Sequence, residues 1–440
     1  MLKRKRNIVI GAILIILIVS LLIGSLVDFT PESLAVTELG GKEVWVDTNF
    51  NDESGGDSGT DKYLDTIVFN DKLYVVSAMY DDSEEIDNSK INVKSYDGEN
   101  WTNVGETMII EKEELVDQIA FCKTESDLYI FYSGLGYLGI KKLDLVTNAW
   151  NDITEMDDVA GAFGFAVATD TIYITAINEN QSVAKIFKFD GTNLSEEKIY
   201  FQENGYIVEP KATMLNDILY VGVREVGKTQ ITVYSYIDGV ITNLNSAIEA
   251  SSYTMTTLRE KIYITTDLGN DSGLIIYTYD GEEWGKIDTG VNYGSPSMVI
   301  KENEVYVLTS SWVTDGKLRT YSYSKSTQEF IQEGEDVDEP ALVAQAIIYN
   351  DYIYTIYQNG TTGEIMAKRK EYVPDYYRGD INQDGRISVA DAIRGAKGLA
   401  GSEPLTDEQK AIGDVNDDGR FGVSDLIKIA KFLAEIIDVL

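Results

Sequence analysis

Residues 70–76 read Asn-Asp-Lys-Leu-Tyr-Val-Val, a polar turn followed by a short apolar strand, and this pattern sets the fold of most of the chain. A β-branched or leucine residue followed by tyrosine recurs seven times between residues 40 and 371. The seven pairs are Leu73-Tyr74, Leu128-Tyr129, Ile172-Tyr173, Leu219-Tyr220, Ile262-Tyr263, Val305-Tyr306 and Ile353-Tyr354. Successive pairs are separated by roughly 40–55 residues, an interval typical of a repeated supersecondary unit.

Each repeat contains more than one strand. About twenty residues after most of the pairs, a second alternating strand ends in a tight turn. The turns include Tyr96-Asp97-Gly98, Phe189-Asp190-Gly191 and Tyr279-Asp280-Gly281. A tryptophan then opens a further strand in three repeats, at Trp101, Trp150 and Trp284. The sequence therefore predicts a mainly β fold, a seven-bladed β-propeller of antiparallel four-stranded blades.

The two ends of the repeat region predict how the propeller closes. The seventh repeat stops near Lys368-Arg369-Lys370 and has no tryptophan strand, whereas residues 43–47 read as such a strand with no blade before it. We expect this first strand to complete the last blade, which leaves no open sheet edge. With its Leu-Tyr strand and its Asp-Gly-x-x-Trp or Thr-Asn-x-Trp tail, the region resembles kelch-type propellers, which implies a kelch-like domain over residues 40–371.

Aromatic residues that recur at one strand position indicate packing between blades more often than a ligand platform. Trp312 differs, because it lies outside the repeat register in Ser310-Ser311-Trp312-Val313, directly after a strand. Among the aromatic side chains, Trp312 is therefore the candidate for a ligand contact. Within the repeats no carboxylate pair or other catalytic signature stands out.

Residues 380–391 and 414–425 are two twelve-residue loops with the same pattern. Acidic or amide side chains occupy positions 1, 3 and 5, and a carboxylate occupies position 12, as in loops that surround Ca²⁺ with oxygen ligands. Position 7 supplies a backbone carbonyl, and position 9 is serine in the first loop but Gly422, with room for water, in the second. The sequence thus predicts two Ca²⁺ sites, with ligands from Asp380, Asn382, Asp384, Arg386, Ser388 and Asp391, and from Asp414, Asn416, Asp418, Arg420 and Asp425.

A helix is expected after each loop, since apolar residues recur there at helical spacing, and a short capped helix is expected to begin near Thr406. This duplicated loop–helix unit, whose loops start at Asp380 and Asp414, resembles a type I dockerin over residues 379–440. The resemblance implies a small all-α module that binds two Ca²⁺ ions and docks on a cohesin-bearing partner. The positions that contact cohesin in that family are Val389, Ala390, Lys397, Val423, Ser424 and Lys431. Residues 372–378 are predicted to be a linker.

Composition excludes several classes of function. The chain has 440 residues and a formal net charge of −36, so its surface repels nucleic acid. It contains no histidine, which removes catalytic triads and His-ligated zinc. The single cysteine, Cys122, lies in an apolar run and is predicted to be a buried thiol.

The first residues predict where the protein resides. A basic stub at residues 1–6 precedes an apolar run about as long as a bilayer is thick, so residues 7–28 are expected to be a transmembrane signal anchor. A cleaved signal peptide with a site near Ser33-Leu34-Ala35 is the alternative. The first interpretation predicts a single-pass protein of the cell membrane with the bulk of the chain extracellular.

Two functions fit this organisation. The first is a membrane-anchored, cohesin-docking component of a cellulosome-like or other surface assembly, in which the propeller binds glycan, including polysaccharide, or protein. The alternative is a polysaccharide-degrading enzyme targeted to a scaffold by its dockerin, which would be a carboxylate-dependent glycosidase or lyase.

Overall fold

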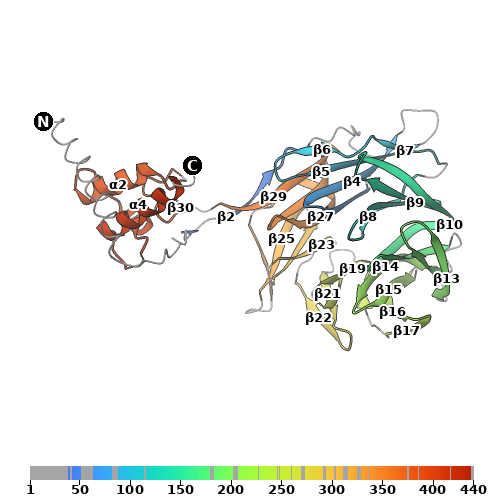
Figure 1. Cartoon of the computed structure of the whole chain (residues 1–440). Coiled ribbons are helices and arrows are strands. Elements are labelled where there is room, and N and C mark those ends of the chain that lie inside the picture. The colour runs from blue at the N-terminus through green and yellow to red at the C-terminus, as the bar shows by residue number, and fades with distance from the viewer. Residues whose placement is uncertain are drawn as a thin grey trace. The chain divides into compact units, whose positions relative to one another are not determined.

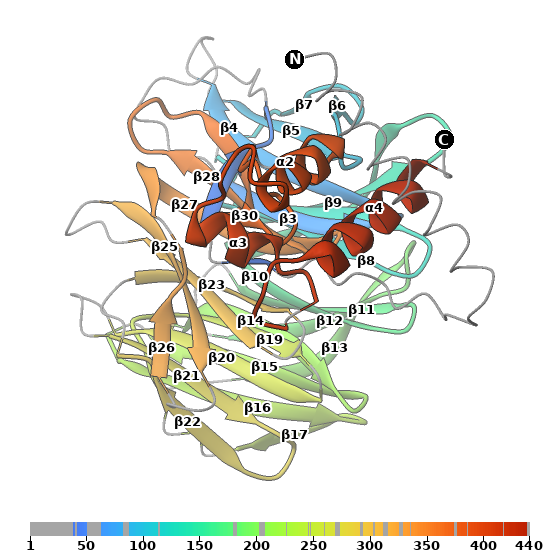
Figure 2. The same cartoon turned by 90° about the vertical axis from the view of Figure 1, so that its left-hand side faces the viewer.

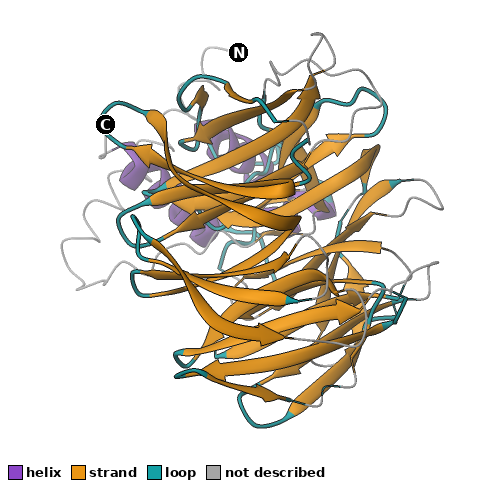
Figure 3. Cartoon of the chain, turned by 90° about the vertical axis from the view of Figure 1, so that its right-hand side faces the viewer, coloured by secondary structure: helices purple, strands orange, loops and turns teal. Residues whose placement is uncertain are grey.

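The structure is a computed structural model of the chain. It describes residues 38–39, 42–50, 63–81, 88–112, 115–178, 183–201, 207–225, 227–244, 246, 248–258, 260–268, 273–290, 294–301, 304–310, 316–324, 329–334, 336–373, 376–384, 386–416 and 418–437. The chain divides into two compact units, one formed by residues 45–371 and one by residues 1–44 together with 372–440. The larger unit is built of strands and the smaller contains the helices (Figures 1 and 3).

Five antiparallel sheets follow one another along the larger unit (Figure 1). The first has the order β3 (Tyr63–Phe69), β4 (Lys72–Asp81), β5 (Asn88–Tyr96), β6 (Trp101–Asn103), with β7 (Met108–Ile110) also on β5. The second has the order β8 (Gln118–Lys123), β9 (Leu128–Asp144), β10 (Ala149–Ala168), β11 (Thr171–Asn178), β12 (Ala184–Phe189), β13 (Leu194–Phe201), where β8 to β13 are neighbours in sequence. The third has the order β14 (Ile207–Leu215), β15 (Ile218–Glu225), β16 (Gln230–Ile237), β17 (Val240–Asn243), with β18 (Ile248–Glu249) also on β16.

The fourth sheet has the order β19 (Ser252–Leu258), β20 (Lys261–Asp267), β21 (Leu274–Tyr279), β22 (Trp284–Asp288). The fifth joins β23 (Gly294–Lys301), β24 (Glu304–Ser310) and β25 (Lys317–Ser324) to β27 (Val337–Tyr349), β28 (Tyr352–Asn359), β29 (Ile365–Val373) and β2 (Lys42–Asp47), with β26 (Glu329–Gln332) on β25. Long strands change partner along their length. The first half of β10 pairs with β9 and the second half with β11, and the register shifts between them.

The seven repeated pairs lie in seven different strands, as predicted. The strands are β4, β9, β11, β15, β20, β24 and β28, and each is hydrogen-bonded to the strand that starts its repeat. Those starting strands contact one another in the cyclic order β3, β8, β10, β14, β19, β23, β27 and back to β3. Sheets arranged around such a set of inner strands form a β-propeller.

Several hairpin turns explain why asparagine and aspartate precede the repeated strands. At Asn70-Asp71, Asn216-Asp217 and Asn350-Asp351, both residues have positive φ, between 47° and 62°. Two consecutive positive φ values are the geometry of a type I′ turn, whose twist matches that of the flanking strands. Asparagine and aspartate tolerate this backbone better than other side-chain-bearing residues, so the sequence marks these hairpins directly.

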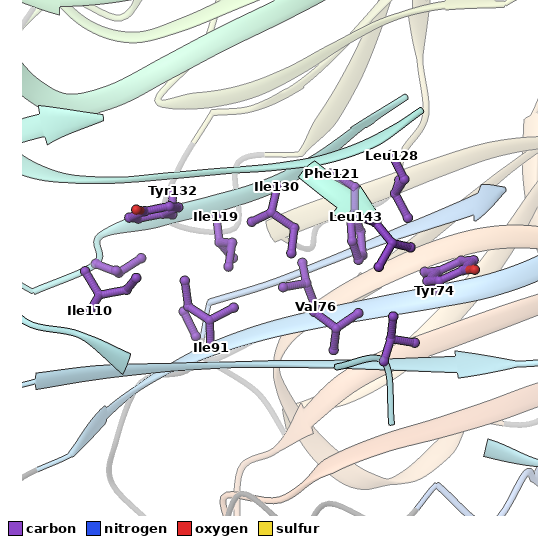
Figure 4. Packing of buried hydrophobic residues seen from close by; sticks show 14 of the residues in the cluster. Tyr74, Val76, Ile91, Ile110, Ile119, Phe121, Leu128, Ile130, Tyr132 and Leu143 are labelled. Carbon is purple, nitrogen blue, oxygen red and sulfur yellow. The ribbon is translucent and has the colours of Figure 1, made fainter. Parts of the chain in front are cut away.

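The core lies between successive sheets. In Figure 4, Tyr74, Val76 and Ile91 of the first sheet face Ile119, Ile130 and Tyr132 of the second. Burial of apolar faces on both sides of a sheet is the main stabilising term of such a fold. The repeated aromatic residues take part in this packing: Trp101 stacks on Tyr96 with ring centroids 4.8 Å apart, and Tyr279 lies equally close to Trp284. Cys122 is buried, as predicted, and burial raises the pKa of its thiol.

The amino-terminal strand β2 pairs with β29 and so completes the last sheet, as the sequence predicted. Thr48, which follows β2, fixes the junction. Its Oγ1 donates a 2.8 Å hydrogen bond to the carbonyl of Ala367 and accepts one of 3.2 Å from Nε1 of Trp101. One buried threonine therefore ties the closing strand to the last and the first sheets.

The smaller unit contains α2 (Val389–Leu399), α3 (Asp407–Gly413) and α4 (Val423–Ile437), seen together in Figure 2. It also contains a short ladder between β1 (Glu38–Leu39) and β30 (Tyr376–Tyr377), so the predicted linker at 372–378 includes a strand. None of the helices in the described ranges is both long and apolar enough to cross a membrane. The predicted anchor at residues 7–28 and Trp312 lie outside the described residues.

We expect Thr48→Val to lower the free energy of unfolding of the propeller by about 1–3 kcal/mol, because it leaves the indole N–H of Trp101 without its acceptor. Urea unfolding with calcium held constant measures the change. Thr242→Val, at an exposed position of β17, is the matched control and should shift the midpoint little. Equal losses in the two variants would contradict the role of Thr48 in closure.

Candidate calcium and docking site

The two predicted calcium loops share one backbone hydrogen-bond pattern. In the first, the N–H of Asn382 donates to Oδ1 of Asp391 at 2.9 Å, and the N–H of Ser388 donates to Oδ2 of the same carboxylate at 2.8 Å. In the second loop, Asn416 and Gly422 make the same bonds to Asp425, at 3.2 and 2.8 Å. The position-12 carboxylate therefore fastens both ends of each loop to the start of the helix that follows.

Position 5 is held in the same repeated way. The N–H of Asp384 donates to Oδ1 of Asp380 at 3.1 Å, and the N–H of Asp418 donates to Oδ1 of Asp414 at 3.2 Å. Each loop therefore closes on the carboxylate of its first residue. The side chains of Arg386 and Arg420 at position 7 are exposed, and the role of their carbonyls as ligands remains a prediction.

The carboxylates of the first loop gather around one point. Asp380 and Asp391 are fully buried, and together with Asp384 they place carboxylate oxygens within 4.8 Å of one another. Among the described residues, this is the one group of three acidic side chains whose oxygens lie close enough together to hold a metal ion. Three carboxylates this close repel one another unless a cation neutralises them, and a hard oxygen-ligated ion such as Ca²⁺ fits the donor set.

The second loop shows why its carboxylates need a cation. Burial, with the charges of Asp414 and Asp418 nearby, raises the pKa of Asp425. A carboxyl group whose pKa is higher in the folded than in the unfolded chain stabilises the fold only while it is protonated. Its contribution is lost as the pH rises through the folded-state pKa. Without a cation the loop would therefore be destabilised at neutral pH, and a bound cation would reverse the effect.

Ser388 has a second role that its loop position does not reveal. It is the N-cap of α2, where its Oγ accepts the N–H of Ala390 at 3.1 Å and lies 3.2 Å from Oδ2 of Asp391. Its predicted place in the calcium site remains a prediction. Thr406 caps α3 in the same way, which confirms the capping box expected there.

A small apolar core holds the two halves together. Ile381 and Val415, each the second residue of a loop, pack with Leu426 and Ile429 of α4. Gly395 lets α2 and α4 approach, because a Cβ atom there would lie 2.6 Å from Leu426 and 2.8 Å from Ile381. The loops therefore cannot shift without moving the helices.

The predicted docking residues form two matching surface patches. Val389 and Val423, the first residues of α2 and α4, are each 55% exposed, and the following residues Ala390 and Ser424 are exposed too. The two predicted lysines lie on the helices that follow the loops. Lys397 forms an ion pair with Glu403 at 2.7 Å, and Lys431 is exposed.

Comparison with known families identifies this unit. Residues 378–434 match the family model described as the dockerin type I domain. The carboxy-terminal unit is a dockerin type I domain. The dockerin covers the two loops and the three helices, which confirms the resemblance found in the sequence, and calcium binding and cohesin docking follow as the expected properties of such a domain.

The propeller resembles solved structures only in outline. One is the β-propeller domain of the Trilobed protease from Pyrococcus furiosus, with 14% identity and a TM-score of 0.48 over 71% of this chain and 97% of that one. Another is the Aleuria aurantia lectin in complex with α-methyl-L-fucoside, with 12% identity and a TM-score of 0.44 over 63% and 95%. The phage phi92 endosialidase has 10% identity and a TM-score of 0.45 over 76% and 68%. No curated protein matches the chain.

The propeller brings together a set of residues that the sequence analysis did not identify. Asp65, Lys211 and Gln345 come from β3, β14 and β27 and line one cavity of about 540 Å³ among the inner strands. One local signal was available: Pro210 stands inside a strand directly before Lys211, and proline within a strand marks a bulge.

We expect the dockerin to bind two Ca²⁺ ions and to lose helical structure without them, because its clustered carboxylates repel one another. Calorimetric titration of the full chain should give two ions, and Asp425→Asn should reduce the number to one. Circular dichroism at the helical minimum should weaken when EDTA replaces calcium.

Asp217→Asn, in a propeller turn, is the matched control and should retain both ions. Identical spectra in EDTA and in calcium would show that folding of the dockerin does not depend on the ion.

Proposed function

We propose that the protein is an extracellular docking component, whose dockerin attaches it to a cohesin-bearing scaffold while its propeller recognises a glycan or a protein. The observation that carries the docking role is the pair of patches at Val389 and Val423, which have the same exposure at equivalent positions of the two halves. Exposed apolar residues at equivalent places in a duplicated unit are suited to burial by a partner.

The duplication supports two docking orientations. A rotation that exchanges α2 with α4 brings Val423 to the place of Val389 and Ser424 to the place of Ala390. Lys397 is already paired with Glu403, so a partner that needs this charge must compete with an internal ion pair.

Two Ca²⁺ ions are proposed to hold the dockerin in its docking form, one in each loop. The matched hydrogen bonds to Asp391 and Asp425 support equal roles for the two loops. Both carboxylates lie in the first turn of a helix whose first two residues form a docking patch. Ion binding and the exposed valines are therefore coupled through the same helix start.

Seven kelch-like blades are proposed for residues 40–371. The cyclic order of seven inner strands supports this number, as do the strands that change partner. The sheet of β8 to β13 contains two four-stranded blades when the long strands β9 and β10 are each counted as two strands. The fifth sheet supplies two more, β23 to β26 and β27 to β29 with β2. The boundaries 40–371, 372–378 and 379–440 belong to the same proposal.

Attachment to the cell membrane through residues 7–28 is a further part of the proposal. Its support is the basic stub and apolar run of the sequence. A chain with an anchor at one end and a dockerin at the other would hold cohesin-bearing partners at the cell surface.

The enzyme alternative has less support. A glycosidase of the common kind needs two carboxylates on opposite sides of the scissile bond. Among the described residues that line the inner-strand cavity, Asp65 is the one carboxylate. A recognition role needs no such pair.

The docking proposal predicts that Val389→Asp and Val423→Asp together weaken cohesin binding by roughly thirtyfold or more, while each single variant retains it through the other patch. Isothermal titration of the full chain with a panel of cohesin domains, in calcium, measures the affinity. Loss of a buried apolar anchor at an interface costs about 2 kcal/mol or more, a factor of roughly thirty in affinity.

Val240→Asp, at a similarly exposed valine of the propeller, is the matched control and should bind like the unmodified protein. If the double variant kept full affinity while still binding two Ca²⁺ ions, the proposed patches would be wrong.

A further inference from the structure

The inner-strand cavity of the propeller is built by successive sheets. Its lining includes Asp65 of β3, Gln118 of β8, Phe165 of β10, Lys211 of β14, Met255 of β19 and Gln345 of β27. Its volume, about 540 Å³, is within the range of small-molecule sites. The lining combines one ammonium group, one carboxylate, amides and threonine hydroxyls with apolar side chains.

Several polar side chains of the inner strands are used to join neighbouring strands. Oδ2 of Asp65 accepts the N–H of Phe121 at 2.7 Å, which links β3 to β8. Gln118 both donates to and accepts from the backbone of Phe163, at 2.9 and 3.1 Å, which links β8 to β10. Thr213 bonds Thr257 at 2.8 Å and links β14 to β19. These polar groups therefore stabilise the contacts between neighbouring inner strands.

Lys211 differs from these bridging residues. Within the described part of the chain, its ammonium makes no hydrogen bond and no ion pair, although it lines the cavity. Burial lowers the pKa of Lys211, while the charges of Glu209 and Asp65 oppose that shift. Lys211 is half-buried, and a ligand anion would supply the partner that its ammonium group lacks.

The backbone around Lys211 carries a bulge of a kind that other inner strands, such as β23 and β27, also have. A bulge places Glu209 and Pro210 between the pairs Val208–Arg224 and Lys211–Gly222, and Glu209 has a positive φ of 51°. Such a conformation is strained for a glutamate and needs support from its surroundings. Bulges next to binding sites commonly re-aim a side chain.

Three neighbours supply that support. The hydroxyl of Tyr253 donates to the carbonyl of Glu209 at 2.7 Å, and Arg224 pairs with the carboxylate of Glu209 at 3.0 Å. Gly164 of β10 faces the same point, where a Cβ atom would lie 2.7 Å from Cα of Lys211. The bulge recurs in other inner strands, but its support by Tyr253, Arg224 and Gly164 fixes the backbone from which the Lys211 side chain projects.

The other side chains that line the cavity limit the chemical class of ligand that it could bind. The carboxylate of Asp65 already accepts the backbone N–H of Phe121, so Lys211 is the charged lining group whose hydrogen-bond donors are still available. Gln345 offers an amide that no hydrogen bond engages among the described residues. Phe165 and Met255 offer apolar surface for a carbon skeleton.

The geometry points to a binding site for a sugar acid, whose carboxylate pairs with Lys211 while Gln345 bonds its hydroxyl groups and Phe165 and Met255 contact the ring. This inference rests on the proposed glycan-recognition role of the propeller and names the ligand class. Charge-assisted hydrogen bonds of this kind are among the stronger polar contacts in proteins.

The test is calorimetric titration of the calcium-loaded full chain with D-galacturonate and with D-galactose, which lacks the carboxylate. We expect binding of the acid and at least roughly tenfold weaker binding of the neutral sugar. Equal affinity for the two sugars, or no binding of the acid, would overturn the inference. Because this comparison uses the unmodified protein, it decides the question even if a variant fails to fold.

Substitutions of Lys211 then test whether this residue binds the sugar acid. Lys211→Met should weaken galacturonate binding by roughly tenfold to a hundredfold, and Lys211→Arg should restore most of it. Lys261→Met, at an exposed lysine of β20, is the matched control. A merely structural lysine would lower the urea midpoint on replacement by methionine. A ligand-binding lysine leaves that midpoint unchanged or raises it, because a desolvated charge is removed.

Unchanged galacturonate affinity in Lys211→Met would overturn the assignment. Cohesin binding, measured on the same samples, reports separately on the docking proposal. Failure of the sugar-acid site and failure of docking are therefore distinguishable.

Discussion

A sheet that is apolar on both faces must be covered on both faces, and this constraint governs the larger unit. Each sheet of the propeller buries its two sides against its neighbours, and the first and last sheets have the same need as the rest. The cluster around Tyr96, Tyr349 and Tyr354 shows how it is met, because its residues come from strands at both ends of the repeat region. Pairing of β2 with β29 and the bonds of Thr48 fix that junction.

Closure of the ring of inner strands brings residues from different sheets together, and this makes a ligand-binding site possible. Strands from successive sheets meet around one cavity, so residues far apart in sequence, such as Asp65 and Gln345, become neighbours of one space. Most polar groups there bridge strands and contribute to the fold. Lys211 is held in place by a bulge, a tyrosine hydroxyl and a glycine, and its ammonium has no bonded partner among the residues that the structure describes. A group that is positioned at such cost and left unpaired is more simply explained by a ligand than by stability.

The dockerin depends on a different interaction, the neutralisation of clustered carboxylates. Its loops present buried Asp380, Asp391 and Asp425, and its apolar core is small. A module of this size has little hydrophobic burial to offset charge repulsion, so we expect ion binding and folding to be coupled. The same helix starts carry the carboxylates and the exposed valines, which would connect the proposed calcium sites to the proposed docking patches.

The sequence by itself determined the features that depend on local order. Loop spacing, helix caps, positive-φ turns and the Leu-Tyr strands are all specified by residues close together in the chain. The dockerin and the repeated strands could therefore be predicted, including the role of residues 43–47 as the closing strand. Burial, charge and partner choice depend on residues brought together from different sheets. Only the tertiary structure therefore showed that Ser388 caps a helix and that Lys397 is paired with Glu403. It alone placed Lys211 in a cavity with no ion pair to any described residue, because no local pattern records which side chains meet when a set of sheets closes.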